Sequence, residues 1–208
     1  MTQVTHGVRA ILSNAGLYDL FQKVMGSGNG QSTFVSTYIR ARTGDRILDI
    51  GCGTAGLLSF LPSVEYYGFD PDPGYINAAI EKYRDRPGAS FICGVVDESV
   101  VRSLGYFDIV VASGVLHHLD DPEAMKLAKL ARAVLKEDGR LVTLDPGLVE
   151  GQSPIARFLA RRDRGRNVRD VEGYRALMTP VFDSVAVDIR HDLGRIPYTH
   201  VIMECAPR

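Results

Sequence analysis

The segment at residues 46–56, RILDIGCGTAG, constrains the fold of this chain more than any other. Its first five residues are mostly apolar and predict a short buried strand. Glycines follow at Gly51, Gly53 and Gly56. Glycine lets the backbone turn sharply and lets a ligand approach the main chain, and a helix that starts there offers unpaired N–H groups. The segment therefore predicts a strand that ends in a ligand-binding turn and leads into a helix.

Strands and helices alternate through the rest of the chain. Short apolar segments predict further strands at 66–69, 90–93, 107–112 and 140–144, and helices at 56–61, 73–83, 97–104 and 122–135. This alternation is typical of a parallel sheet with helices on both faces. Two more strands, 181–190 and 198–205, are joined by a short connection and predict an antiparallel pair at the end of the sheet.

Two helical regions flank this core, and we expect one domain over residues 1–208. Residues 1–44 predict two helices separated by a loop at the glycine-rich 26–30, the second helix running from about 32 to 41. An arginine-rich helical insertion is expected at 149–178.

Composition excludes several classes of protein. Lys plus Arg total 24 and Asp plus Glu total 25 in 208 residues, so no basic field favours a nucleic acid or a membrane as partner. Three scattered cysteines predict neither a disulfide framework nor a zinc site. Free thiols, the absence of a signal peptide and the absence of a long apolar stretch predict a cytoplasmic protein.

Two acidic residues follow the first two strands and indicate what the glycine turn binds. The glycine pattern fits a dinucleotide, but Asp49 lies two residues before Gly51, where a pyrophosphate is unfavourable. A carboxylate there suits a ligand with an ammonium group and a sulfonium, such as S-adenosylmethionine (SAM). Asp70 ends the next strand, where a ribose diol is expected. The alternatives are a turn or helix cap for Asp49 and a helix cap for Asp70.

Four segments between Asp45 and Pro146 resemble, in order, the motifs of class I SAM-dependent methyltransferases of the type 11/12-like group: ILDIGCGTAG, YYGFDPDPGYI, FDIVVASGVLHHLDDP and VLKEDGRLVTLDP. The resemblance implies a Rossmann-like α/β fold with a seven-stranded sheet of order 3-2-1-4-5-7-6, strand 7 antiparallel and helices on both faces. It also implies that 1–44 forms an N-terminal helical lid and that 149–178 forms a helical substrate cap.

The same resemblance implies SAM as cofactor and S-adenosylhomocysteine as product. It assigns a set of cofactor-binding positions: Asp49, Gly51, Cys52, Gly53, Asp70, Pro71, Asp97, Ser113, Gly114 and His118. The chain departs from the family at the adenine contact, because relatives place an acidic residue directly after the glycine that ends strand 3. Here two valines follow Gly94, so Asp97 is either the displaced adenine ligand or a helix cap.

Candidate catalytic residues follow the fourth and fifth strands. His117 is the candidate general base for a hydroxyl acceptor, since histidine takes up a proton near neutral pH. The alternative for His117 and His118 is a packing element of the family. Some relatives carry acidic residues implicated in metal binding in this region, and the substitution by Gly114 and the two histidines predicts no metal site. Asp145 lies on the ligand edge or forms a turn, and His200 is expected to be structural.

Acceptor-binding candidates lie in the two flanking regions. Arg157, Arg161 and Arg164 share a helix face by spacing and would favour an anionic small molecule; the alternative is a solvated surface. Tyr18 would cover the cofactor or pack as a core aromatic residue.

The predicted function is methyl transfer from SAM to oxygen or nitrogen of a small-molecule acceptor. The alternatives are a non-catalytic SAM-binding protein and an NAD-dependent oxidoreductase. A nucleic-acid methyltransferase is disfavoured, because the fourth strand ends in Ala-Ser-Gly and the chain is not basic. Methylation of a protein stays open, and the sequence does not fix an oligomeric state.

Overall fold

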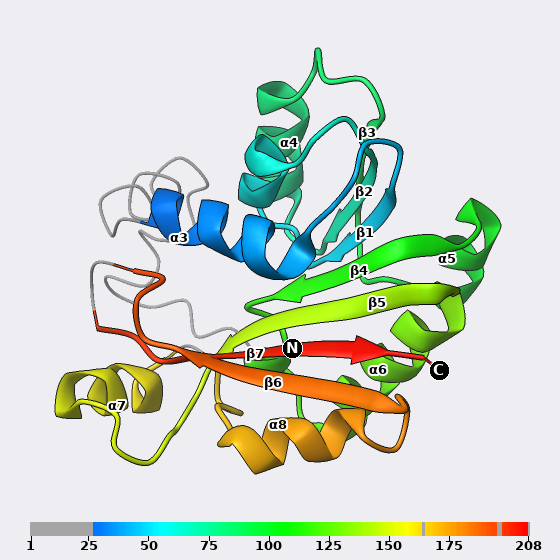
Figure 1. Cartoon of the computed structure of the whole chain (residues 1–208). Coiled ribbons are helices and arrows are strands. Elements are labelled where there is room, and N and C mark those ends of the chain that lie inside the picture. The colour runs from blue at the N-terminus through cyan, green and yellow to red at the C-terminus, as the bar shows by residue number, and fades with distance from the viewer. Residues whose placement is uncertain (1–26, 164, 195–196, 208) are drawn as a thin grey trace.

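A seven-stranded sheet forms the centre of the computed structural model, which describes residues 27–163, 165–194 and 197–207 (Figure 1). The strand order is β3-β2-β1-β4-β5-β7-β6, and β7 is antiparallel to both neighbours. The strands are β1 Arg46–Ile50, β2 Glu65–Asp70, β3 Ala89–Cys93, β4 Phe107–Ser113, β5 Leu135–Pro146, β6 Ser184–Arg190 and β7 His200–Ala206. The predicted order and the antiparallel β7 are confirmed.

Helices cover both faces of the sheet. One face carries α3 (Ser27–Phe34), the π-helical turn η1 (Val35–Ile39), the 3₁₀ helix η2 (Gly56–Phe60) and α4 (Pro73–Lys82). The other face carries α5 (Glu98–Leu104), the 3₁₀ helix η3 (Leu116–His118), α6 (Asp121–Val134) and α8 (Val171–Met178). The short α7 (Pro154–Arg161) follows β5.

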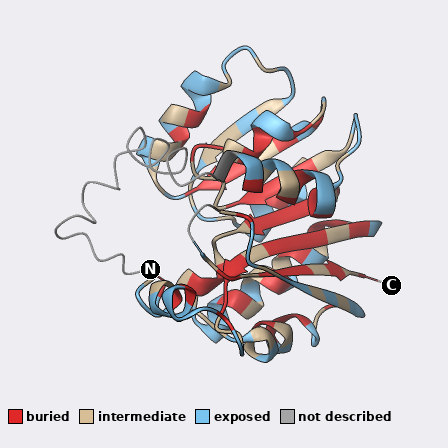
Figure 2. Cartoon of the chain, turned by 60° about the vertical axis from the view of Figure 1, so that its left-hand side comes forward, coloured by how far each residue is buried: buried red, intermediate tan, exposed pale blue. Residues whose placement is uncertain are grey.

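The central strands are buried on both faces, which explains their continuous apolar sequence. Along β4, Ile109 and Val111 pack against the α3–α4 side, whereas Val110 and Ala112 pack against the α6–α8 side. Figure 2 shows this buried band through the middle of the sheet. Two separate hydrophobic layers, one on each face of the sheet, therefore hold the central strands and position their ends.

Side-chain caps fix where most helices begin. The caps are Asp72 for α4, Asp97 for α5, Asp120 for α6, Ser153 for α7 and Asp170 for α8. Each accepts a hydrogen bond from a free backbone N–H in the first turn, and proline stands at the start of three of these helices. These local signals explain why the predicted helix starts lie close to the observed ones.

The glycine-rich segment at 26–30 is not a loop over its described part, and this prediction was wrong. Helix α3 begins at Ser27 and runs through Gly30. A Cβ at Gly30 would lie 1.7 Å from the carbonyl oxygen of Leu193. Gly30 therefore lets the helix pack directly on another backbone. The following helical segment ends at Ile39, two residues before the predicted end, because Arg40 takes a left-handed conformation with φ of 45°.

Strand β5 begins at Leu135, earlier than the predicted residue 140, and its pairing with β4 shifts register between Phe107 and Ile109. Within the described residues, no helix is long and apolar enough to cross a membrane.

Candidate functional site

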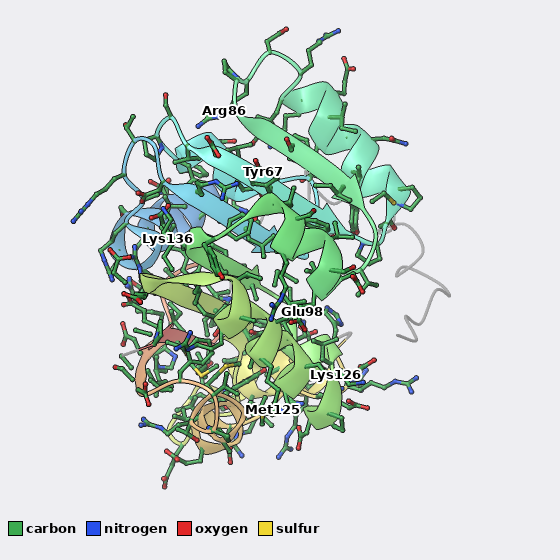
Figure 3. The ribbon with its side chains drawn as sticks, turned by 90° about the vertical axis from the view of Figure 1, so that its right-hand side faces the viewer. Tyr67, Arg86, Glu98, Met125, Lys126 and Lys136 are labelled. Carbon is green, nitrogen blue, oxygen red and sulfur yellow. The ribbon has the colours of Figure 1, made fainter. Side chains whose placement is uncertain are left out.

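The polar residues singled out by sequence meet at one edge of the sheet. Strands β1, β2, β4 and β5 run parallel, so Asp49, Asp70, Ser113 and Asp145 all lie at or near their carboxyl ends. Ligands of open α/β sheets bind at this edge. A surface groove also lies at the opposite edge, where Arg86, labelled in Figure 3, donates to the carbonyl oxygens of Leu61 and Pro62. We place the site at the carboxyl ends.

The turn after β1 requires glycine. Gly51 has φ of +73° and Gly53 has φ of +55°, a region that L side chains rarely adopt. The N–H groups of Gly51 and Cys52 donate to the carbonyl oxygen of Phe69 at 2.7 and 3.0 Å, which ties the turn to β2. Among the described residues, a Cβ at Gly53 would meet no atom within 4 Å. The turn therefore leaves open space above Gly53, as a ligand cradle does.

Asp49 is a buried carboxylate at the mouth of this turn. It is 2 % exposed, and the Tyr66 hydroxyl donates to its Oδ2 at 2.5 Å. Burial raises the pKa of Asp49 to about 7, against the opposing effect of the Tyr66 hydrogen bond. Asp49 caps none of the described helices, and the helix after the glycine turn starts from Ala55 without a side-chain cap, so the geometry favours the ligand interpretation.

Asp70 turns back onto the glycine turn. It accepts the N–H of Gly53 at 3.0 Å and the N–H of Asp72 at 2.9 Å. Burial raises its pKa, and these two N–H donors oppose the rise. Asp72, not Asp70, caps α4 through the N–H groups of Gly74 and Tyr75. Because each carboxylate oxygen has a second lone pair, Asp70 keeps the capacity to accept hydroxyl hydrogen bonds.

Asp97 caps α5, which is the second of the two roles considered from sequence. It accepts from the N–H groups of Ser99 and Val100, and the Ser99 hydroxyl and these backbone donors lower its pKa. The carboxyl is exposed, so the cap does not exclude a contact with a ligand. At the end of β4, Gly114 has φ of +72° and donates its N–H to the carbonyl oxygen of Leu144 at 2.7 Å.

His117 lies between two carboxylates. Its Nδ1 is 2.7 Å from Oδ1 of Asp145, and its Nε2 is 3.2 Å from Oδ1 of Asp163. Burial alone would lower the pKa of His117, but the two carboxylates outweigh burial and raise it to about 9. The imidazole therefore carries its proton at neutral pH and has no free lone pair in this arrangement. Burial also raises the pKa of Asp145, against the effect of His117, whereas His117 and Tyr198 hold that of Asp163 low despite burial.

Residues 163 and 165–169, which we call the strap, bind η3 along its length. A Cβ at Gly165 would lie 2.1 Å from Cδ2 of His117, and the N–H of Asn167 donates to the His117 carbonyl oxygen at 3.0 Å. The guanidinium of Arg169 donates to the carbonyl oxygens of Leu116 and Leu119. The strap thus fixes the connection between the arginine-rich insertion and the end of β4.

The remaining residues predicted from sequence lie at different distances from the cluster of His117, Asp145 and Asp163, which we call the histidine centre. The ring of His118 contacts that of His117, with centroids 4.0 Å apart. Arg157 and Arg161 are exposed on α7, and Ala156 and Ala160 form its buried side. Tyr18 and Arg164 lie outside the described residues.

The sequence did not indicate Asp163 and Tyr198 as members of the histidine centre. The Tyr198 hydroxyl donates to Asp163 across 35 positions of the chain, and no local pattern marks either residue. His200 was expected to be structural. Its Nδ1 is buried without a hydrogen-bond partner among the described residues, and burial lowers its pKa to about 4. No group of acidic, histidine and cysteine side chains in the described part is arranged to hold a metal ion.

Residues 48–141 match the family model described as a methyltransferase domain. A curated relative, methyltransferase adrK of Penicillium rubens, is 34% identical over 107 residues, which cover 46% of this chain and 39% of that protein. The chain therefore spans about two fifths of the length of this relative.

Solved structures show the same fold at low sequence identity. An O-methyltransferase family protein from Burkholderia thailandensis has a TM-score of 0.70 and 16% identity, covering 98% of this chain and 61% of that chain. Human N-acetylserotonin methyltransferase in complex with SAM has a TM-score of 0.69 and 18% identity, covering 96% of this chain and 58% of that chain.

Proposed function

The chain contains a methyltransferase domain of the class I, SAM-dependent family, and on that premise we propose that it transfers a methyl group from SAM to oxygen or nitrogen of a small-molecule acceptor. One observation carries this proposal. The glycine turn, the buried Asp49 and the inward-facing Asp70 lie at one edge of a sheet with the strand order of the family.

The residues of the turn fit this cofactor. The open space above Gly53 accommodates a ligand against the main chain, and Asp49 offers a buried negative charge for the ammonium of the methionyl group. Asp70 would accept the ribose hydroxyls. We further propose backbone or side-chain contacts to the cofactor from a set of neighbours: Gly51, Cys52, Pro71, Asp97, Ser113, Gly114 and His118.

SAM supplies a methyl carbon that is already activated by a positively charged sulfur. In such a transfer the acceptor's lone pair would form the new bond to carbon as the carbon–sulfur bond breaks. The electron pair of the broken bond would stay on sulfur, and the acceptor's proton would pass to water. The protein's contribution is alignment of the acceptor and exclusion of water at the ends of β4 and β5. No step of this kind requires an invariant catalytic side chain.

His117 was the sequence candidate for a general base, and its role stays a proposal. Both of its ring nitrogens face carboxylates, so we propose that it acts mainly as a positioning residue, which holds Asp145 and the strap around the acceptor. A role as base would require the contact with Asp163 to open.

The flanking regions serve the acceptor in this proposal. Residues 1–44 would form the lid, Tyr18 included, and residues 149–178 the substrate cap of a single domain. Arg157 and Arg161 would contact the acceptor only if it is anionic, and their exposure on α7 supports a solvated surface equally well. Cytoplasmic location stays a prediction from composition.

Binding measurements test the function. Calorimetry should show that SAM and S-adenosylhomocysteine bind the full chain, whereas NAD should not, since Asp49 would lie against its pyrophosphate. A screen of small molecules for release of S-adenosylhomocysteine then separates an enzyme from a non-catalytic SAM-binding protein. Binding of NAD in preference to SAM would contradict the proposal.

A further inference from the structure

Asp145 carries an oxygen atom that the fold leaves without a partner. Its Oδ1 receives two hydrogen bonds from His117, one from Nδ1 at 2.7 Å and one from the backbone N–H at 3.2 Å. Its Oδ2 is buried and has no hydrogen-bond partner of normal geometry among the described residues, although the backbone N–H of Leu116 lies near enough to lower the pKa of the carboxyl. The residue is 1 % exposed, so bulk water does not replace the missing donor. A buried acceptor without a donor costs free energy and indicates an absent partner.

Among the described residues, the charges around this oxygen do not balance. Asp145 and Asp163 each bring a carboxylate, and His117 brings one positive charge, which leaves one negative charge in excess. Asp163 receives further hydrogen bonds from Tyr198 and from the N–H of Gly165, both of them uncharged donors. The nearby Arg169 pairs with Asp121. A buried excess charge is stabilised best by a ligand of opposite sign.

The position of Asp145 places this oxygen on the acceptor side of the site. It follows Leu144, whose carbonyl oxygen receives the N–H of Gly114 at the end of β4. Asp49 and Asp70, the proposed cofactor carboxylates, lie on β1 and β2, on the other side of β4 in the sheet. The unpartnered oxygen therefore lies on the β5 side of β4, away from the two proposed cofactor carboxylates.

We propose that Oδ2 of Asp145 binds a protonated amine of the methyl acceptor, so that the acceptor is a cationic small molecule and not an anionic one. This inference rests on the proposed function and names its substrate class. It concerns recognition and makes no claim about which atom is methylated. Arg157 and Arg161, which would favour an anion, are exposed on α7, whereas Asp145 is buried at the strand end.

Paired probes test the charge preference without knowledge of the natural acceptor. Tyramine and 4-hydroxyphenylpropionate share a phenol and differ in carrying an ammonium or a carboxylate, and phenethylamine and phenylpropionate form a second pair without the hydroxyl. Calorimetry on the full chain with bound S-adenosylhomocysteine should show binding of the amine of each pair, at least tenfold tighter than the carboxylate. Equal or tighter binding of the carboxylates, or no binding of either amine, would overturn the inference.

The variant Asp145→Asn tests the assigned atom. Loss of a charge-assisted hydrogen bond should weaken amine binding by roughly 10- to 100-fold and leave the affinity for S-adenosylhomocysteine unchanged. Asp138→Asn changes an exposed carboxylate near the amino end of β5, at the opposite edge of the sheet, so it is the matched control and should change neither affinity. Weaker binding of S-adenosylhomocysteine to Asp145→Asn would place the oxygen against the cofactor and overturn the inference. Failure of the wild type to bind S-adenosylhomocysteine would instead count against the proposed function.

Discussion

The two halves of the ligand edge are built in different ways. In the proposed cofactor half, the bonds from Tyr66 to Asp49 and from Gly53 to Asp70 each span 17 positions, and all four residues lie in the unit formed by β1, η2 and β2. In the acceptor half, His117 reaches Asp145 across 28 positions, and Tyr198 reaches Asp163 across 35. A compact motif fixes the first half, whereas three separate connections must dock to form the second. The two halves should therefore respond independently to substitution.

The strap offers the strongest test of that independence. In Gly165→Ala the new Cβ would overlap His117, its backbone carbonyl included, so the strap must shift. We expect the free energy of unfolding to fall by about 3 kcal/mol, the upper end for an overpacked site. Urea denaturation measures this loss. Gly151→Ala is the control. Its Cβ meets no atom of the described residues within 4 Å and only the backbone φ of +74° is strained, so about 1 kcal/mol should be lost.

Affinity for S-adenosylhomocysteine should be retained in folded Gly165→Ala. A parallel loss of cofactor affinity would show that the halves are coupled.

The pH dependence of stability should report on the acceptor half through His117. Its pKa is about 9 in the folded protein against 6.5 for an ordinary histidine, so its stabilising effect is complete below pH 6.5 and is lost as pH rises through about 9. The shift corresponds to about 3 kcal/mol of unfolding free energy. Denaturation between pH 6 and 10 measures it, and His117→Gln should remove this part of the profile. An unchanged profile would mean that His117 is not a buried cation.

Substitution in the cofactor half should act on SAM affinity and spare stability. Asp49→Asn and Asp70→Asn each lose a charge-assisted contact, which costs about 1.5–3 kcal/mol of binding free energy. Calorimetry with S-adenosylhomocysteine measures the change, and thermal unfolding without ligand checks that the fold persists. Wild-type affinity in both variants would remove these carboxylates from the cofactor site.

Cofactor affinity should also depend on pH, with a midpoint set by Asp49. Its pKa is about 7, and only the ionised carboxylate attracts the ammonium of SAM. Affinity should therefore fall as pH decreases below 7, by about tenfold per unit, or about 1.4 kcal/mol. Tyr66→Phe removes the hydrogen bond that lowers this pKa, so its midpoint should move to higher pH. The same midpoint in Tyr66→Phe and the wild type would argue against control by Asp49.

The smallest effect is expected on the surface of α7. Arg157→Gln combined with Arg161→Gln should change unfolding free energy and SAM affinity by less than about 0.5 kcal/mol, since both side chains are exposed. Acceptor kinetics separate the two interpretations of this face. A raised Michaelis constant would identify an anion-binding cap, and an unchanged one a solvated surface.

Signals between residues that are close in sequence account for the strands and helices that were predicted correctly. The strands β1 to β4 were predicted within one or two residues, because apolar runs bounded by glycine and capping residues specify them. The loop predicted at residues 26–30 was wrong, because glycine there serves close packing against Leu193, and sequence does not distinguish this from a break. The helix cap that the sequence offered as the alternative role of Asp70 belongs to Asp72, two residues later.

The sequence by itself determined the α/β fold and, through the family resemblance, its strand order. It also singled out the residues of the proposed cofactor half, because they lie close together in the chain. The tertiary structure alone decided the state of His117. Whether an imidazole is a free base or a buried cation depends on which carboxylates surround it, and Asp163 and Asp145 reach it from separate connections. Contacts at such separations leave no periodic or local signal, so only the folded chain shows them.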